Sequence, residues 1–233
     1  MIKLNHIVYC YSNITMQFNF QVNKSEKVII LGPSGSGKST LLYLIAGFQY
    51  PKQGEIWLNN KNHTTTAPSK RPVSILFQEN NLFSHLTVWQ NIALGISPNL
   101  HLKQDQHNTV KQIIEQVSLK NCTTRLPSQI SGGQRQRTAL ARCLIRKKSI
   151  LLLDEPFSAL DSALRNEMII LLKKVCDEQQ LTMLMVSHNL EDANQISTRS
   201  IVISEGRIAY DGHPYLLING STPASILFGI SYP

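Results

Sequence analysis

Residues 32–39 read GPSGSGKS and match the pattern G-x-x-x-x-G-K-[ST] of loops that bind nucleotide phosphates. The glycines allow the backbone to curl so that its N–H groups point at phosphate oxygens, and the N-terminus of a following helix adds partial positive charge. In such a loop Lys38 reaches the β- and γ-phosphates, and the Ser39 hydroxyl binds Mg²⁺. A chance Gly-Ser turn is disfavoured, because an apolar run precedes the loop and a predicted helix follows it. The residues predicted to bind the nucleotide are Gly32, Pro33, Ser34, Gly35, Ser36, Gly37, Lys38, Ser39 and Thr40.

A second group of candidate residues is the acidic pair Asp154 and Glu155, which follows four apolar residues at 150–153. In open α/β sheets, ligands bind at the carboxyl ends of the strands, and this pair stands at such an end. We expect Asp154 to bind the Mg²⁺ ion that accompanies the nucleotide. Glu155, on the other side of the pleat, can face a water molecule and act as the general base in phosphate hydrolysis. A strand that merely ends in acidic residues is the alternative, and the phosphate loop argues against it.

The segment SGGQ at 131–134 predicts the start of a helix. Ser131 and Gln134 have the spacing of a capping box, in which each side chain accepts a hydrogen bond from the backbone N–H of the other residue. Taken alone, the segment could be an ordinary capped helix that begins with a glycine turn.

The elements that must position these residues follow from hydrophobic periodicity. Alternation over 15–22 predicts a half-exposed antiparallel strand, and the uninterrupted apolar run at 27–31 predicts a buried parallel strand. Apolar residues at helical spacing predict helices near 110–117 and at 162–178. The other elements expected are a helix at 39–46 and strands at 55–58, 73–77, 150–153, 182–186, 200–204 and 207–210.

This succession of elements predicts an α/β fold with a P-loop NTPase core, in which helices flank a mostly parallel sheet. An N-terminal antiparallel β subdomain and a helical insertion complete the expected architecture. We expect a single domain over 1–233, with the nucleotide-binding core at about 1–81 and 149–233 and the helical subdomain at about 82–148.

Composition excludes several classes of protein. The 233 residues are 42% hydrophobic, which is enough for a buried core and argues against disorder. No apolar run approaches the roughly 18–20 residues needed to span a bilayer, and the N-terminus lacks the apolar core of a signal peptide. Four scattered cysteines without a CxxC pair indicate reduced thiols of a cytosolic protein. The net charge of +8 favours a nucleotide, a nucleic acid or an anionic membrane surface as partner, without choosing among them.

Taken together, the motifs resemble those of the ATPase subunits of ABC transporters. The segment ISGGQRQR at 130–137 is similar to the signature of that family, with Ile130 where Leu is usual. The order of motifs along essentially the whole chain also fits: GPSGSGKS at 32–39, FQEN at 77–80, SGGQ at 131–134, ILLLDE at 150–155, SALD at 158–161 and VSHNLEDA at 186–193. The resemblance implies an enzyme that hydrolyses ATP, with Mg²⁺, to move a solute across a membrane.

The resemblance also implies a role for each motif, because in this family two ATPase subunits pack head to tail around ATP. Glu155 would be the general base, His188 would hold the γ-phosphate, and Gln78 would contact Mg²⁺ and the attacking water. The residues implied to contact nucleotide bound to the partner chain are Ser131, Gly132, Gly133, Gln134 and Asp161. The implied Mg²⁺ ligands are Ser39, Gln78 and Asp154.

The family stacks an aromatic side chain on adenine, upstream of the phosphate loop. Tyr11 fits this role best and Tyr9 is the alternative, and the spacing does not decide between them. The ordinary interpretation of Tyr9 is a strand residue that packs in the hydrophobic core.

Three segments, 63–95, 156–168 and 182–188, resemble the ATPase subunits of bacterial thiamine importers in particular. This likeness implies uptake of thiamine or its phosphates, with an importer of iron, polyamines or another solute as the alternative. A nucleic-acid-associated ATPase of related fold is less favoured, because the span from Lys38 to Ser131 leaves no room for a long coiled coil.

An importer of this kind implies partners and a location. Its ATPase homodimer would lie at the cytoplasmic face of the bacterial inner membrane, bound to integral-membrane permease subunits that a periplasmic solute-binding protein serves. No nucleic acid is expected as a partner. Residues 83–94 would form part of a groove that accepts a short cytoplasmic helix of the permease. The apolar residues expected to divide there between core and docking surface are Phe83, Leu86, Val88, Trp89 and Ile92.

Overall fold

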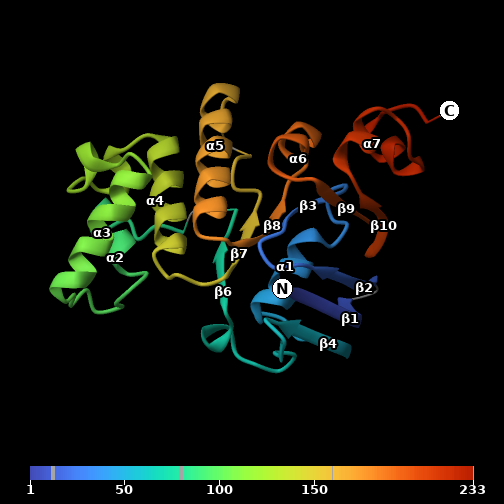
Figure 1. Cartoon of the computed structure of the whole chain (residues 1–233), viewed down its shortest axis with the longest axis horizontal. Helices are drawn as coiled ribbons and strands as arrows, with labels where there is room; N and C mark the ends of the chain where they lie inside the picture. Colours follow the sequence, from blue (N-terminus) through green and yellow to red (C-terminus); the bar gives the residue numbers. More distant parts are fainter. Residues whose placement is uncertain (12–13, 79–80, 159, 233) are drawn as a thin grey trace.

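The computed structural model describes residues 1–11, 14–78, 81–158 and 160–232, and it contains two sheets flanked by helices (Figure 1). The strands are β1 (Ile2–Tyr11), β2 (Ile14–Val22), β3 (Lys27–Leu31), β4 (Gln53–Leu58), β5 (Lys61–Asn62), β6 (Val73–Leu76), β7 (Ile150–Asp154), β8 (Thr182–Val186), β9 (Arg199–Ser204) and β10 (Arg207–Gly212). The helices are α1 (Lys38–Ala46), α2 (Val88–Ala93), α3 (Gln104–Gln116), α4 (Gly132–Leu144), α5 (Ser162–Glu178), α6 (Leu190–Ile196) and α7 (Pro214–Ile218). Short 3₁₀ turns lie at η1 (Pro68–Lys70), η2 (Lys120–Cys122), η3 (Pro127–Gln129) and η4 (Pro223–Phe228).

The larger sheet has the strand order β10-β9-β3-β8-β7-β6. Its strands are parallel except β10, which pairs antiparallel with β9. β7 and β8 are buried at every residue, as expected for apolar runs in a sheet with both faces covered. Because β3, β6, β7 and β8 run the same way, their carboxyl ends lie along one edge of the sheet.

The smaller sheet has the order β2-β1-β4-β5 and is antiparallel throughout. In β2, residues from Met16 to Val22 alternate between buried and exposed, so the predicted half-exposed strand is confirmed. The antiparallel sheet and α1 together cover one face of the larger sheet.

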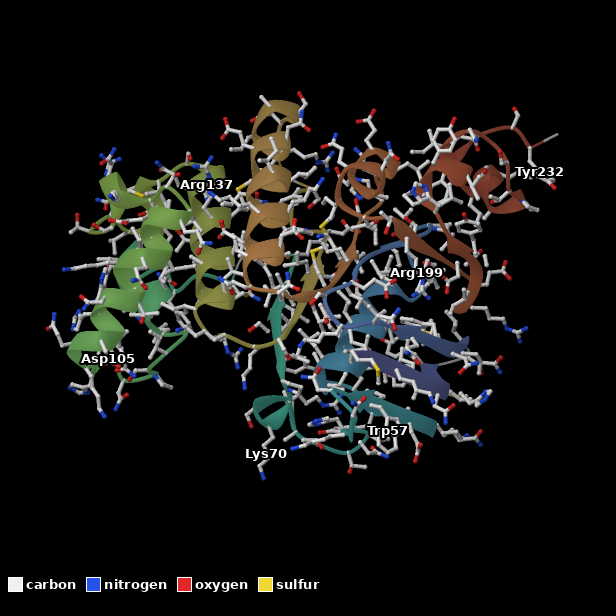
Figure 2. The ribbon with its side chains drawn as sticks, viewed as in Figure 1. Trp57, Lys70, Asp105, Arg137, Arg199 and Tyr232 are labelled. Carbon is white, nitrogen blue, oxygen red and sulfur yellow. The ribbon has the colours of Figure 1, made fainter. Side chains whose placement is uncertain are left out.

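Side chains of the larger sheet divide between two hydrophobic cores. Val28 and Ile30 face a core shared with α1 and the antiparallel sheet, whereas Ile29 and Leu31 face one shared with α2 to α6. The division follows from strand geometry, because successive side chains point to opposite faces. Charged side chains such as Lys70 and Asp105 project from the outer surface instead (Figure 2).

Residues 82–148, all in the described part of the chain, contain α2, α3 and α4 and no strand. The chain leaves the sheet after β6 and returns to it at β7, the adjacent strand. In Figure 1 the three helices stand to the left of the sheet, with α4 nearest to α5.

The predicted α/β class with a mostly parallel sheet is confirmed. The predicted bounds of the helix at 162–178 and the strands at 27–31 and 182–186 are those of α5, β3 and β8. α3 begins at Gln104, before the apolar stripe from Val110, because its first turns are polar and carry no hydrophobic signal. Over the described ranges, no helix combines the length and the apolar character that a membrane span requires.

Candidate functional site

The loop at 32–37 joins the buried strand β3 to α1. Gly32 and Gly37 have φ angles of 142° and 106°, in the left-handed region that favours glycine. A Cβ at Gly32 would lie 2.0 Å from the carbonyl oxygen of Ile203, so a larger residue does not fit there. Gly37 precedes α1 without a side-chain cap, and the N–H groups of the first turn therefore lack that partner. The loop and the helix end can together surround an anion with backbone donors.

Lys38 begins α1 and has 6% of its surface exposed. Its Nζ atom donates hydrogen bonds to the carbonyl oxygens of Gly32 and Pro33, at 2.8 and 2.7 Å. Burial lowers the pKa of Lys38, and the charges of Glu155 and Asp154 oppose that shift. A buried ammonium held against this loop favours an anionic ligand, because a buried charge is stable only when it is paired.

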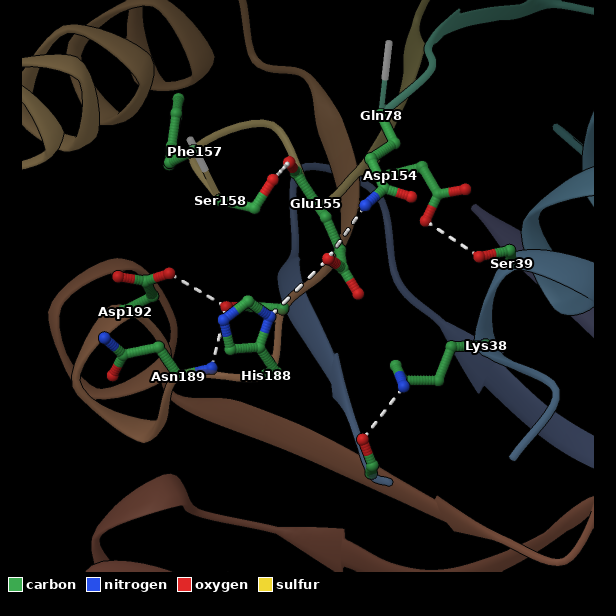
Figure 3. Close-up of polar contacts among 12 residues, drawn as sticks. Lys38, Ser39, Gln78, Asp154, Glu155, Phe157, Ser158, His188, Asn189 and Asp192 are labelled. Carbon is green, nitrogen blue, oxygen red and sulfur yellow. Dashed lines mark hydrogen bonds and ion pairs between the residues drawn. The ribbon is translucent and has the colours of Figure 1, made fainter. Parts of the chain in front are cut away.

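Asp154 ends β7 inside the protein, 2% exposed, and its Oδ1 accepts a hydrogen bond from the Ser39 hydroxyl at 3.0 Å (Figure 3). Burial raises the pKa of Asp154, while the hydrogen bond from Ser39 and the charge of Lys38 lower it. The carboxylate and the hydroxyl offer two oxygen ligands of the kind that Mg²⁺ prefers. Within the described residues, no three His, Cys, Asp or Glu side chains could hold a metal ion together. Binding of Mg²⁺ here would therefore depend on phosphate oxygens as well, as is usual for this ion.

Side chains from three neighbouring strand ends meet at Glu155 (Figure 3). Gln78 follows β6, Glu155 follows β7 and His188 follows β8. The Nε2 atom of Gln78 donates to Oε2 of Glu155 at 3.4 Å, and Nδ1 of His188 lies 3.5 Å from the same oxygen. The two acidic side chains point in different directions, Asp154 toward Ser39 and Glu155 toward His188. The arrangement leaves one carboxylate for a cation and the other for proton transfer.

The start of α4 is held by contacts of its own. The Ser131 hydroxyl accepts a hydrogen bond from N of Gln134 at 3.2 Å, and Oε1 of Gln134 accepts one from N of Ser131 at 3.0 Å, so the predicted capping box is confirmed. Ser131 and Gly132 are exposed. Gly133 is buried so closely against α5 that a Cβ would lie 2.4 Å from Cδ2 of Leu164. Among the described residues, no hydrogen bond links this helix end to the phosphate loop of the same chain.

Asp161 serves as the N-cap of α5, because its Oδ1 accepts a hydrogen bond from N of Leu164 at 3.0 Å. This contact gives Asp161 a structural role within its own chain, whatever else it contacts.

The two candidate tyrosines differ in exposure. Tyr11, at the end of β1, is 62% exposed, whereas Tyr9 packs against the core beneath the antiparallel sheet. Tyr9 pairs across the strands with Met16, and a Cβ at Gly37 would lie 2.9 Å from the Met16 sulfur. This end of the sheet therefore lies beside the phosphate loop, and Tyr11 has the larger surface for stacking.

Sequence reasoning missed the contacts among four residues at the loop that carries His188: Arg165, Ser187, Asn189 and Asp192. Only Asn189 left a local signal, because asparagine directly before a helix is a typical N-cap. The contact between Arg165 on α5 and Asp192 on α6 depends on tertiary packing and has no sequence spacing that would reveal it.

Comparison with known sequences gives close matches over 99% of the chain. A family model described as ABC transporter matches residues 15–158. The thiamine import ATP-binding protein ThiQ of Photorhabdus laumondii subsp. laumondii is 58% identical over 230 residues, which cover 99% of this chain and 98% of that protein. The protein of the same name from Yersinia pestis is 57% identical over the same shares of the two chains.

Solved structures share the fold. CbiO1 of Clostridium perfringens, part of the ABC transporter complex cbiONQ, matches with a TM-score of 0.84 and 27% identity, over 93% of this chain and 90% of that one. The dimeric post-hydrolysis state of the ATP-binding cassette MJ0796, bound to ADP and Pi, matches with a TM-score of 0.79 and 28% identity, over 92% of this chain and 99% of that one.

Proposed function

This chain belongs to the ABC transporter family as one of its ATPases, and from that membership we propose that it powers the import of thiamine or its phosphates. The observation that carries the catalytic part of the proposal is the meeting of Gln78, Glu155 and His188 beside the phosphate loop. The solute is supported by relatives of 55–58% identity, all named thiamine import ATP-binding proteins.

In the proposed reaction, the backbone of residues 32–37 and the Lys38 ammonium bind the phosphates of ATP. Glu155 accepts a proton from the attacking water, and its neighbours Gln78 and His188 orient that water and the γ-phosphate. The donor set around Asp154 fits Mg²⁺, which when bound would neutralise charge on the β- and γ-phosphates with Ser39, Gln78 and Asp154 as ligands. Tyr11 stacks on the adenine ring.

The proposal places ATP between two copies of the chain packed head to tail. Each copy supplies its phosphate loop to one site and the start of α4 to the other. The support is the exposure of Ser131 and Gly132 at a helix N-terminus, where partial positive charge suits an anion. Gly133, Gln134 and Asp161 complete the partner's side of the site in this arrangement.

The permease docks, in this proposal, in a groove of about 560 Å³ between the sheet edge and the helical segment. Phe83 lines this groove and is 48% exposed, whereas Val88 and Ile92 are buried in the core. Phe77 also lines the groove, and the next residue, Gln78, reaches Glu155. One peptide bond therefore separates Phe77, which lines the docking groove, from Gln78, which contacts the general base. The ATPase dimer lies at the cytoplasmic face of the inner membrane, and a periplasmic binding protein delivers the solute to the permease.

Uptake of labelled thiamine tests the whole proposal. The chain is expressed with its permease and binding protein in a bacterial strain that lacks its own thiamine-import ATPase. We expect uptake with the wild-type chain and none with Glu155→Gln, which binds ATP but loses the base, slowing hydrolysis by about 10²–10⁴-fold. Glu115→Gln, a change on α3 at an exposed ion pair with Lys120 of η2, serves as the control and should transport normally. ATP hydrolysis accompanied by uptake of iron or a polyamine, and not of thiamine, would contradict the proposed solute.

Mixed dimers test the head-to-tail site. Chains carrying Lys38→Ala and Ser131→Arg, each inactive alone, are combined so that one composite site receives both lesions and the other receives none. Because the arginine side chain blocks the helix end without altering its own phosphate loop, the mixture should recover ATP-driven dimerisation and some hydrolysis. A mixture that stays inactive would show that each chain builds its site alone.

A further inference from the structure

One buried serine, Ser187, fixes the loop that carries His188 through several hydrogen bonds. The Ser187 hydroxyl donates to Oδ2 of Asp192 at 2.8 Å and accepts a hydrogen bond from N of Asn189 at 3.0 Å. The backbone N of Ser187 donates to the carbonyl oxygen of Ile30 at 3.0 Å, which ties the loop to β3. The position of His188 therefore depends on what holds Asp192.

Asp192 lies in the first turn of α6, is 2% exposed, and has a second partner on another helix. Its Oδ1 lies 3.6 Å from Nε of Arg165, which α5 supplies. The Nη2 atom of Arg165 donates to the carbonyl oxygen of Phe157 at 3.2 Å. Phe157 follows Glu155 by two residues, so Arg165 joins the segment after the general base to the helix after His188.

These contacts form a closed path. It runs from Glu155 along the backbone to Phe157, across Arg165 and Asp192 to Ser187, and then to His188. The distance of 3.5 Å between Nδ1 of His188 and Oε2 of Glu155 closes the path (Figure 3).

Asp192 is suited to fixing the geometry of this path, because few arrangements of the neighbouring groups can satisfy its buried charge. Burial raises the pKa of Asp192, and the hydrogen bond from Ser187 and the charges of Arg165 and His188 lower it. A carboxylate removed from water is stable only where donors and a cation meet it, so it restricts the groups around it to one arrangement.

We propose that Asp192 and Arg165 are positioning residues for ATP hydrolysis, which hold His188 at its distance from Glu155. The inference rests on the proposed function, in which His188 acts on the γ-phosphate and Glu155 on the attacking water. Neither Asp192 nor Arg165 touches the nucleotide in this scheme; both act through His188.

A double-mutant cycle on the full chain tests the proposal. Hydrolysis of Mg-ATP is measured for Asp192→Asn and Arg165→Met, each alone and combined with His188→Ala. Displacing a catalytic group by about 1 Å costs on the order of a hundredfold, so kcat should fall by about 10- to 100-fold with little change in KM. In the His188→Ala background the same changes should cost less than about twofold, because the residue they position is gone. Lys174→Met, which breaks an exposed ion pair on α5, is the matched control.

Further variants and a spectroscopic readout separate positioning from folding. Arg165→Lys keeps the positive charge and should retain more activity than Arg165→Met, and Ser187→Ala removes only a hydroxyl in case the charged variants do not fold. The ring NMR signal of His188, identified by its loss in His188→Ala, should move in Asp192→Asn and stay in place in Lys174→Met. Additive losses in the cycle, or a His188 signal that does not move, would overturn the positioning role. A wild-type chain that hydrolyses no ATP would overturn the proposed function instead, and the NMR signal would still report on His188.

Discussion

Replacing Arg71 with methionine should destabilise the chain strongly, because this side chain is fully buried and satisfies the end of the helix that begins at the phosphate loop. Its Nη1 atom donates to the carbonyl oxygens of Leu44 and Ile45 at 2.8 and 3.0 Å, near the C-terminus of α1. Its Nε atom donates to the carbonyl oxygen of Thr66 at 2.8 Å. Gly47 lies directly against the guanidinium, since a Cβ there would be 2.4 Å from Nε of Arg71.

The magnitude follows from these three hydrogen bonds, which are the shorter ones among the four that Arg71 donates. A hydrogen bond from a charged donor contributes about 1.5–3 kcal/mol, which gives a gross loss of about 4–9 kcal/mol. The net loss of unfolding free energy is smaller, because methionine no longer requires a charge to be buried. Removing one partner of a buried charged network typically costs about 3–5 kcal/mol. For a chain of this length, 1 kcal/mol shifts Tm by about 2–4 °C, so we expect Tm to fall by about 6–20 °C.

Urea unfolding followed by far-UV circular dichroism measures this loss. Arg71→Lys should lie between the wild type and Arg71→Met, because an ammonium cannot span both sets of carbonyl groups. Arg207→Met, at an exposed position of β10, is the control and should unfold like the wild type. An Arg71→Met chain within about 1 kcal/mol of the wild type would refute the reasoning, since the lost hydrogen bonds of the guanidinium could not then carry the expected penalty.

Two further predictions concern the phosphate-loop lysine and the cysteines. Lys38→Ala should weaken equilibrium binding of ATP by about 10- to 100-fold, measured by calorimetry, because a charge-assisted contact with phosphate is lost; unchanged binding with slower turnover would exclude this ground-state role. The four cysteines are free thiols, and burial raises the pKa of Cys143 to about 11 and that of Cys176 to about 12, so at pH 8 both remain protonated and unreactive. A chromogenic disulfide reagent at pH 8 should therefore label exposed Cys10 quickly in the folded chain and all four cysteines after denaturation; rapid native labelling of Cys143 or Cys176 would contradict the burial.

The local parts of the site could be predicted because their signals lie within a few residues. The capping box needs only Ser131 and Gln134, and the phosphate loop needs only its glycines, Lys38 and Ser39. The buried strands could be recognised from uninterrupted apolar runs, since both faces of the sheet are covered.

Contacts between distant segments could not be predicted, because no periodicity links them. Arg71 follows a 3₁₀ turn in which Lys70 is exposed, and an arginine there would ordinarily be placed on the surface. Its burial arises only because the end of α1 brings carbonyl groups to that point. The pairing of Arg165 with Asp192 depends in the same way on how α5 packs beside α6.

The sequence by itself determined the α/β class, the phosphate loop, the acidic pair after β7 and the helix start at Ser131, because short-range sterics, hydrogen bonding and hydrophobic periodicity encode each of them. The motifs implied that Gln78, Glu155 and His188 serve one site, and the tertiary structure decided which atoms meet there, with Gln78 and His188 at Glu155 and Ser39 at Asp154. It also decided that, among the described residues, Ser131 makes its hydrogen bonds within its own helix and none to the phosphate loop of its own chain. The physical reason is strand order: β6, β7 and β8 are neighbours in the sheet although they are far apart in the chain, and only the packed sheet brings their ends together.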